Sequence, residues 1–253
     1  MAAARNLREA PMPLFDPDEA VAVALPEGAL PSYIRDHRKR LRARFREGGA
    51  ASVAEYELLE LVLFRAIPRQ DVKPLARHLL DRFGDFASVL AASPPRLAEV
   101  PGVGEAVVTE LKIVEAAAQR MARAKVMNRH VITSWDALLD YCHTVMSHRE
   151  TEHFRVLYLD RKNCLIADEE IGQGTVDHVP VYPREVVRRA LELNASALIL
   201  VHNHPSGDPT PSDQDIIVTG QIQEAAQILG ITLHDHIIVG RSREASLRAL
   251  GYL

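Results

Sequence analysis

The chain has 253 residues, of which 47% are hydrophobic and 25% charged, and its formal net charge is -4. This composition is that of a globular protein with room for one to three domains, and it excludes a basic field over the whole molecule. Two cysteines, Cys142 and Cys164, are too few for a disulfide framework and suit a reducing compartment. No apolar run approaches the ~18 residues of a membrane span, so we expect a cytoplasmic protein with no membrane partner.

The first part of the chain is rich in proline and then in arginine. Residues 1–31 contain five prolines and no sustained period, which predicts a flexible tail. Residues 35–46 then concentrate basic side chains, including Arg38, Lys39 and Arg40, against one aspartate. Such a run can neutralise the phosphates of DNA. It is equally typical of the solvated face of a helix whose apolar residues point inward.

Residues 32–124 are predicted to form an all-helical domain, with helices near 56–64, 71–83 and 106–123. Pro-Gly-Val-Gly before the last of these helices resembles the turn of a helix-hairpin-helix. Gly102 and Gly104 permit a tight turn around Val103, and its N–H groups beside a helix N-terminus can hold a phosphate. The alternative is a purely structural turn between helices.

Residues 132–253 are predicted to form a second domain, a mixed sheet flanked by helices, after a connector at 124–131. Strands and helices alternate there. The pattern predicts a helix at 134–146, strands at 154–159 and 164–167, a helix at 183–194, a strand at 197–202, a helix at 212–230 and a last strand pair within 231–239.

Two histidines and an aspartate follow the strand at 197–202. Residues two apart on a strand point to the same side, so His202 and His204 direct both imidazoles at one point. Ser212 then marks a helix start, with Asp215 in its first turn. Catalytic zinc takes three such ligands and leaves a fourth position to water. The alternative is a polar surface loop in which Asp215 complements the helix dipole.

Hydrolysis at such a metal also requires a proton shuttle beside it. Spacing alone leaves several glutamates upstream of His202 as candidates, namely Glu150, Glu152, Glu169, Glu170 and Glu185. Glu185 has a simpler explanation, because it falls in the first turn of the helix that begins at Pro183.

The spacing of His202, His204, Ser212 and Asp215 matches a known signature. His-x-His, seven residues, Ser, two residues and Asp resembles the JAMM (MPN+) metallohydrolase motif at every fixed position. Over about residues 30–253, including an N-terminal helix-hairpin-helix region, the chain is similar to the RadC branch of that superfamily. The strings that carry this similarity are Tyr182-Pro183-Arg184-Glu185, Asn194-Ala195, His202-Asn203-His204-Pro205-Ser206-Gly207 and Asp235-His236-Ile237-Ile238-Val239.

The resemblance implies an α+β protein whose C-terminal domain has the JAMM/MPN-like fold, a curved mixed sheet with flanking helices. It implies one zinc ion per chain, bound by His202, His204 and Asp215, with a zinc-bound water as nucleophile. It favours Glu152, directly ahead of the strand at 154, as the general acid/base. Ser212 would donate to the oxyanion of a tetrahedral intermediate or cap its helix.

Two functions from different classes follow. The first is a zinc metallopeptidase or isopeptidase acting on a protein or peptide. The second is a DNA-repair or recombination accessory protein whose metal site is structural or acts on nucleic acid. Three ligands favour the first, since structural zinc normally takes four protein ligands, while the glycine turn and the basic run favour the second. A second His-x-His pair, His234 and His236, lacks the Ser-x-x-Asp and is expected to orient a loop or to contact the first site from outside.

Overall fold

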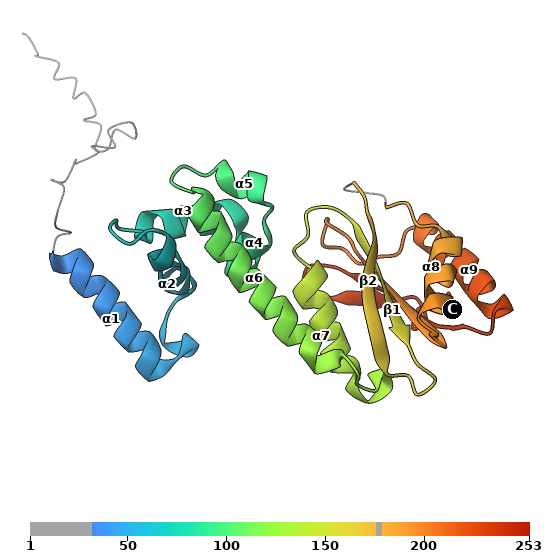
Figure 1. Ribbon diagram of the computed structural model, residues 1–253. Coiled ribbons are helices and arrows are strands. Elements are labelled where there is room, and N and C mark those ends of the chain that lie inside the picture. The colour runs from blue at the N-terminus through green and yellow to red at the C-terminus, as the bar shows by residue number, and fades with distance from the viewer. Residues whose placement is uncertain (1–31, 176–178) are drawn as a thin grey trace, which may run out of the picture.

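The computed structural model describes residues 32–175 and 179–253, so the tail predicted over 1–31 lies outside the described residues. A helical region comes first, and a mixed five-stranded sheet flanked by helices follows (Figure 1). This is the α+β class predicted from the sequence. Within the described residues, no helix is long and apolar enough to cross a membrane.

The helical region has a core of its own. Its elements are α1 (Ser32–Gly48), a 3-10 turn (Ala50–Ser52), α2 (Glu55–Ala66), α3 (Lys73–Phe83), α4 (Phe86–Ala91), α5 (Pro94–Ala98) and α6 (Glu105–Val126). Gly84, at φ 103°, ends α3, and Asp85 begins α4 by accepting a hydrogen bond from the backbone N–H of Ser88. Fully buried leucines from α2, α3, α5 and α6 fill the space between these helices: Leu59, Leu63, Leu79, Leu97 and Leu111.

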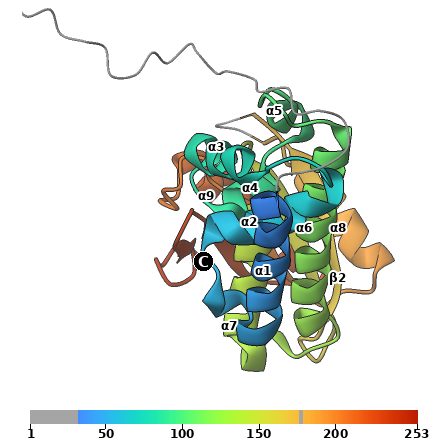
Figure 2. The ribbon, with the colours of Figure 1, turned by 90° about the vertical axis from the view of Figure 1, so that its left-hand side faces the viewer.

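Helix α6 connects the two parts of the molecule. It continues to Val126, past the end predicted at 123, because Val126 is buried in the core beneath the sheet. The chain then pairs with the sheet through bridges from Met127 to Leu165 and from His130 to Cys164. In Figure 2, which looks at the molecule from the end that carries α1, α6 is seen to the right of α1 and roughly parallel to it.

The sheet has the order β2-β1-β3-β4-β5. Its strands are β1 (His153–Leu159), β2 (Leu165–Gln173), β3 (Ala197–Asn203), β4 (Thr232–Val239) and β5 (Glu244–Ser246). Only β3 and β4 are parallel among these pairs, and α9 (Asp213–Ile228) makes the crossover between them. The strand pair predicted within 231–239 is wrong. That segment is the single strand β4, because the chain does not turn until Gly240. The antiparallel partner of β4 is β5, which follows that turn.

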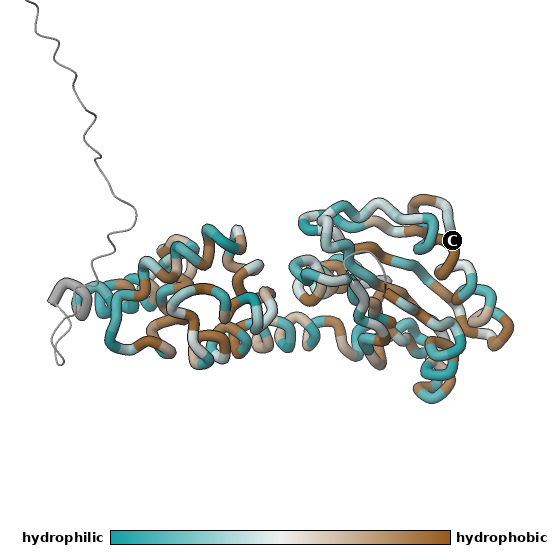
Figure 3. The backbone as a smooth tube through the Cα atoms, turned by 90° about the horizontal axis from the view of Figure 1, so that it is seen from above, coloured by the Kyte–Doolittle hydropathy of each residue, from teal (hydrophilic) through white to brown (hydrophobic). Residues whose placement is uncertain are grey.

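Helices cover both faces of the sheet. After a 3-10 turn (Val131–Ser134), α7 (Trp135–Met146) packs on one face, while α8 (Pro183–Glu192) and α9 pack on the other. The central strand β3 is buried along its whole length. Figure 3 shows hydrophobic stretches in both the helical part and the sheet part of the molecule, interspersed with hydrophilic ones. Leu198 and Leu200 face α8 and α9, whereas Ile199 and Val201 face α7. By the same alternation His202 faces α9.

Candidate metal centre

The three candidate metal ligands, His202, His204 and Asp215, meet where β3 ends and α9 begins. The loop between them is attached to the end of β4, because the His204 N–H donates to the Val239 carbonyl at 3.0 Å and the Arg241 N–H to the Gly207 carbonyl at 3.2 Å. Gly207 has φ 85°, a conformation that favours glycine. A Cβ at Gly240 would lie 2.4 Å from the Gly207 carbonyl oxygen, so only glycine allows the two backbones to approach this closely.

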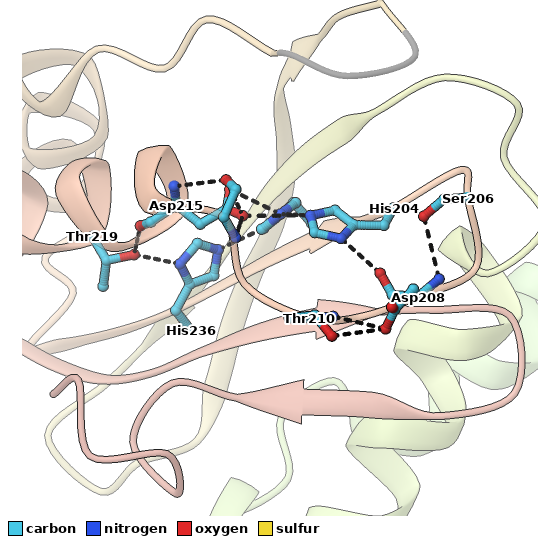
Figure 4. A network of polar contacts seen from close by, with 9 residues as sticks. His204, Ser206, Asp208, Thr210, Asp215, Thr219 and His236 are labelled. Carbon is cyan, nitrogen blue, oxygen red and sulfur yellow. Dashed lines mark hydrogen bonds and ion pairs between the residues drawn. The ribbon is translucent and has the colours of Figure 1, made fainter.

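Three ligand atoms converge at this point (Figure 4). The Nε2 atoms of His202 and His204 are 3.0 Å apart. The Asp215 carboxylate places Oδ1 3.1 Å from the first Nε2 and Oδ2 3.4 Å from the second. The structure therefore brings together all three residues that the sequence named as ligands.

The outer nitrogens of both imidazoles have partners of their own. His204 Nδ1 lies 2.8 Å from the Asp208 carbonyl oxygen, which can only accept, so Nδ1 carries the proton and a neutral His204 presents a lone pair at Nε2. His202 Nδ1 lies 2.8 Å from His236 Nε2. Two imidazole nitrogens and a carboxylate at about 3 Å from one another form a donor set that fits a zinc ion, which binds such ligands at ~2.0–2.2 Å.

The electrostatics of the cluster suit a cation. Burial alone would raise the pKa of Asp215, but in the metal-free chain the facing imidazoles of His202 and His204 and the hydrogen bond from Ser212 outweigh it and hold the pKa of this carboxyl far below its usual range. The pKa of His204 is raised, chiefly by its hydrogen bond with Asp215, and the charge of Glu152 adds to the shift. The site therefore keeps an ionised carboxylate ready for a positive partner.

Ser212 is the N-cap of α9 and also holds the carboxylate ligand. Its backbone N–H and its hydroxyl both donate to Asp215 Oδ2, at 2.8 and 2.7 Å, and its Oγ accepts from the Asp215 N–H at 3.2 Å. This is a capping box in which Asp215 occupies the position usually taken by glutamate or glutamine. The same carboxylate starts the helix and faces the two imidazoles.

Glu152 lies beside the cluster. It is half-buried directly ahead of β1, and it lines a cleft of about 520 Å³ together with His204, Ser212 and Asp215. Among the glutamates weighed from the sequence, it is the one that lines this cleft in the part of the chain that the structure describes. The others form ion pairs with arginines: Glu150 with Arg96, Glu169 with Arg189, Glu170 with Arg155 and Glu185 with Arg188.

Asn203, between the two histidines, ties the backbone on both sides of Glu152 to β3. Its Oδ1 accepts from the His153 N–H at 2.9 Å, and its Nδ2 donates to the Thr151 carbonyl at 3.0 Å. The Asn203 side chain is 1% exposed, so water cannot replace these bonds. The strand that ends in the ligands therefore also fixes the backbone that carries Glu152.

The basic residues named as candidate DNA contacts divide into two groups. Lys39 and Arg40 are exposed on α1. Arg38 is buried: its guanidinium donates to the carbonyls of Ile67 and Gln70 at 2.6 and 2.5 Å, and it lies over the Phe64 ring. These bonds engage Arg38 inside the helical region, which leaves Lys39 and Arg40 as the exposed members of the three.

The glycine turn named as a phosphate site lies between α5 and α6. Gly102 has φ 88°, Val103 is buried in the helical core, and Gly104 is the N-cap of α6. The first residue of α6 is Glu105, whose charge opposes an anion at this helix start.

Comparison with known proteins places the chain in a family. The model of the RadC-like JAB domain matches residues 132–252. A UPF0758 protein of Ruegeria pomeroyi is 75% identical over 224 residues, which are 88% of this chain and 100% of that protein. The chain belongs to the RadC family of the JAB/MPN superfamily. A UPF0758 protein of Rhodobacter capsulatus is 72% identical over 213 residues, 84% of this chain and 100% of that protein.

The matched RadC domain contains the whole cluster and its supporting residues. Sequence reasoning expected His236 to contact the site from outside, and it does so through His202. It did not single out Asn203 or Thr219. Asn203 lies within the quoted string, and its place between two ligands was the available signal. Thr219 hydrogen bonds with His236, its hydroxyl oxygen 2.5 Å from His236 Nδ1, and no pattern in the sequence marks it.

Proposed function

We propose that this RadC-family protein is a zinc-dependent hydrolase of amide bonds, a metallopeptidase or isopeptidase. The observation that carries the proposal is the convergence of His202, His204 and Asp215 on one point, in a cleft that is also lined by Glu152. The RadC-like JAB domain supports it, because the same motif resembles that of JAMM metallohydrolases.

The chain's own residues can carry out most of the reaction. Zinc, when bound, activates a water molecule by lowering its pKa to ~7 and polarises the carbonyl of the amide. The Glu152 carboxylate takes a proton from the attacking water and passes it to the leaving nitrogen. Asn203 fixes the backbone beside Glu152, and Ser212 fixes the carboxylate of Asp215.

The cleft suits an extended chain as substrate. Val179, Val181 and Val218 are among its lining residues, and so is the exposed Tyr182. A lining that combines apolar side chains with a few polar groups can bind the side chains of a peptide and orient its backbone. This shape supports a peptide rather than a small polar metabolite.

A structural role for the metal is less well supported. A structural zinc ion normally has four protein ligands, whereas the cluster found in the described residues has three. His204 and Asp215 also line a cleft, so a fourth position on the metal would be accessible to water or substrate.

We propose as a second function that the helical region binds DNA without sequence preference. The supporting observation is a hollow of about 750 Å³ beside α1 that is lined by Arg40, Arg44 and Lys73. Arg44 forms an ion pair with Glu57, so Arg40 and Lys73 would make the larger contribution to phosphate binding. This function is compatible with the first, because the two sites lie in different parts of the chain.

The deciding experiment compares zinc-loaded full-length protein on peptides, isopeptide-linked conjugates and DNA. Peptide or isopeptide hydrolysis is expected, with DNA left intact. Glu152→Gln should keep its zinc and lose about 10²–10⁴-fold in rate, since an amide cannot accept the proton. His204→Ala should lose zinc and activity together. Cleavage of DNA alone, or full activity of Glu152→Gln, would contradict the proposed mechanism.

A further inference from the structure

A chain of buried hydrogen bonds extends from the metal centre into the protein. His202 Nδ1 lies 2.8 Å from His236 Nε2, and His236 Nδ1 lies 2.5 Å from the Thr219 hydroxyl oxygen. That hydroxyl also lies 2.5 Å from the backbone carbonyl oxygen of Asp215. This series of hydrogen bonds thus starts at His202 and ends at the backbone of Asp215, passing through side chains of β4 and α9 (Figure 4).

The direction of these bonds follows from what each group can donate. The Asp215 carbonyl can only accept, so the Thr219 O–H donates to it and the Thr219 oxygen is left to accept from His236 Nδ1–H. A neutral imidazole has one N–H, so His236 Nε2 then accepts. His202 must therefore carry its proton on Nδ1, which leaves the lone pair of its Nε2 directed at the ligand cluster.

The surroundings favour a neutral, ordered chain. His202, Thr219 and His236 are each at most 1% exposed. The Phe154 ring stacks on His202 at 5.9 Å and meets His236 edge-on at 5.4 Å, so an apolar ring covers the bonds on one side. A buried polar group without its partner costs free energy, so each member stabilises the orientation of the next.

We propose that His236 and Thr219 are positioning residues for the metal centre, which hold His202 in the tautomer that binds metal and thereby set the zinc affinity. This inference rests on the proposed zinc function, and it adds residues that do not touch the metal themselves. Partners that hold a ligating histidine typically change metal affinity by about 10–100-fold when they are removed.

Thr219 offers the sharper test because two substitutions separate shape from hydrogen bonding. Thr219→Val keeps the volume and loses the hydroxyl, whereas Thr219→Ser keeps the hydroxyl. Zinc affinity of the full-length protein would be measured by competition with a chelator. Thr219→Val should bind zinc about 10–100-fold more weakly, and Thr219→Ser should remain within a few-fold of wild type.

His236 provides a second pair of variants on one strand. His236→Phe removes the acceptor for His202 and should weaken zinc binding by a similar factor. His234→Phe is the control, because His234 instead contacts Asn163 at 2.7 Å, and it should bind zinc as wild type does. Urea unfolding of the metal-free variants would show that any variant compared is folded.

The outcomes separate this proposal from the proposed function. Wild-type affinity in Thr219→Val, with zinc binding intact in the parent protein, would overturn the positioning role and leave the metal site standing. Equal weakening by Thr219→Val and Thr219→Ser would also overturn it, because the hydroxyl would then not be the operative group. A parent protein that binds no zinc would overturn the metal function, and this inference with it.

Discussion

Substitution of Asn203 by alanine tests how the chain holds its candidate base. The side chain makes two buried hydrogen bonds, to the His153 N–H and to the Thr151 carbonyl. Asn203→Ala leaves both backbone groups without these partners. An unsatisfied buried group costs about 1–3 kcal/mol, so we expect a loss of about 2–6 kcal/mol in the free energy of unfolding of the sheet domain.

The effect on catalysis should exceed the effect on the metal. Asn203 points to the face of the sheet opposite His202, so its loss should leave the ligands in place. It frees the backbone on both sides of Glu152, and a displacement of ~1 Å in a catalytic group can lower the rate by about 10²-fold. Zinc content should therefore stay near one per chain while turnover falls.

The assay is urea unfolding followed by the fluorescence of Trp135. This is the single tryptophan of the chain, and it packs at the start of α7 against the core beneath the sheet. Gln221→Ala is the control, because Gln221 is an exposed amide on the wall of the same cleft, and such a change should stay within about 0.5 kcal/mol. If Asn203→Ala lowered the free energy of unfolding by less than about 0.5 kcal/mol, as the control should, the reasoning would be refuted.

Three further outcomes are expected. Arg40→Glu with Lys73→Glu should lower the slope of log affinity for duplex DNA against log salt by about 2, measured by fluorescence anisotropy with charge reversals in the turn between β1 and β2 as the control. Burial raises the pKa of Cys142 to about 12, so an alkylating reagent at pH 8 should modify half-buried Cys164 in the native protein and Cys142 only after unfolding. Asp168→Asn should destabilise the protein by about 1–3 kcal/mol in urea, because the buried Asp168 carboxylate accepts two hydrogen bonds from the Arg155 guanidinium and an amide can accept only one of them, while Glu170 remains as the second partner of Arg155.

The convergence of the three candidate metal ligands could be predicted because local sequence determines where their side chains point. An apolar run that ends in His-x-His predicts a strand end with two imidazoles on one side, and Ser-x-x-Asp predicts a helix start. Both features appear in the structure at β3 and α9. What the sequence could not provide is the distance between these two ends, which the pairing of β3 with β4 and the packing of α9 determine.

The supporting residues could not be predicted for the same reason. His236 reaches His202 because β4 pairs with β3 in a register that places it opposite Leu200, and a bulge at residue 234 shifts that register by one residue. No periodicity in the sequence indicates such a shift. Arg38 is a similar case, since it stands in a run of exposed cations and only the packing of α1 on α2 buries it.

Ser212 illustrates why a folding signal and a catalytic signal can be difficult to separate. The Ser212 hydroxyl donates to Asp215 Oδ2, and its oxygen accepts from the Asp215 N–H. In this geometry the donor and the acceptor of the hydroxyl both serve to hold Asp215. A Ser212→Ala variant would therefore lose activity whether or not the hydroxyl ever contacts an oxyanion. Zinc affinity distinguishes the two roles, because loss of the cap releases the carboxylate and weakens metal binding, whereas loss of an oxyanion donor lowers turnover at unchanged affinity.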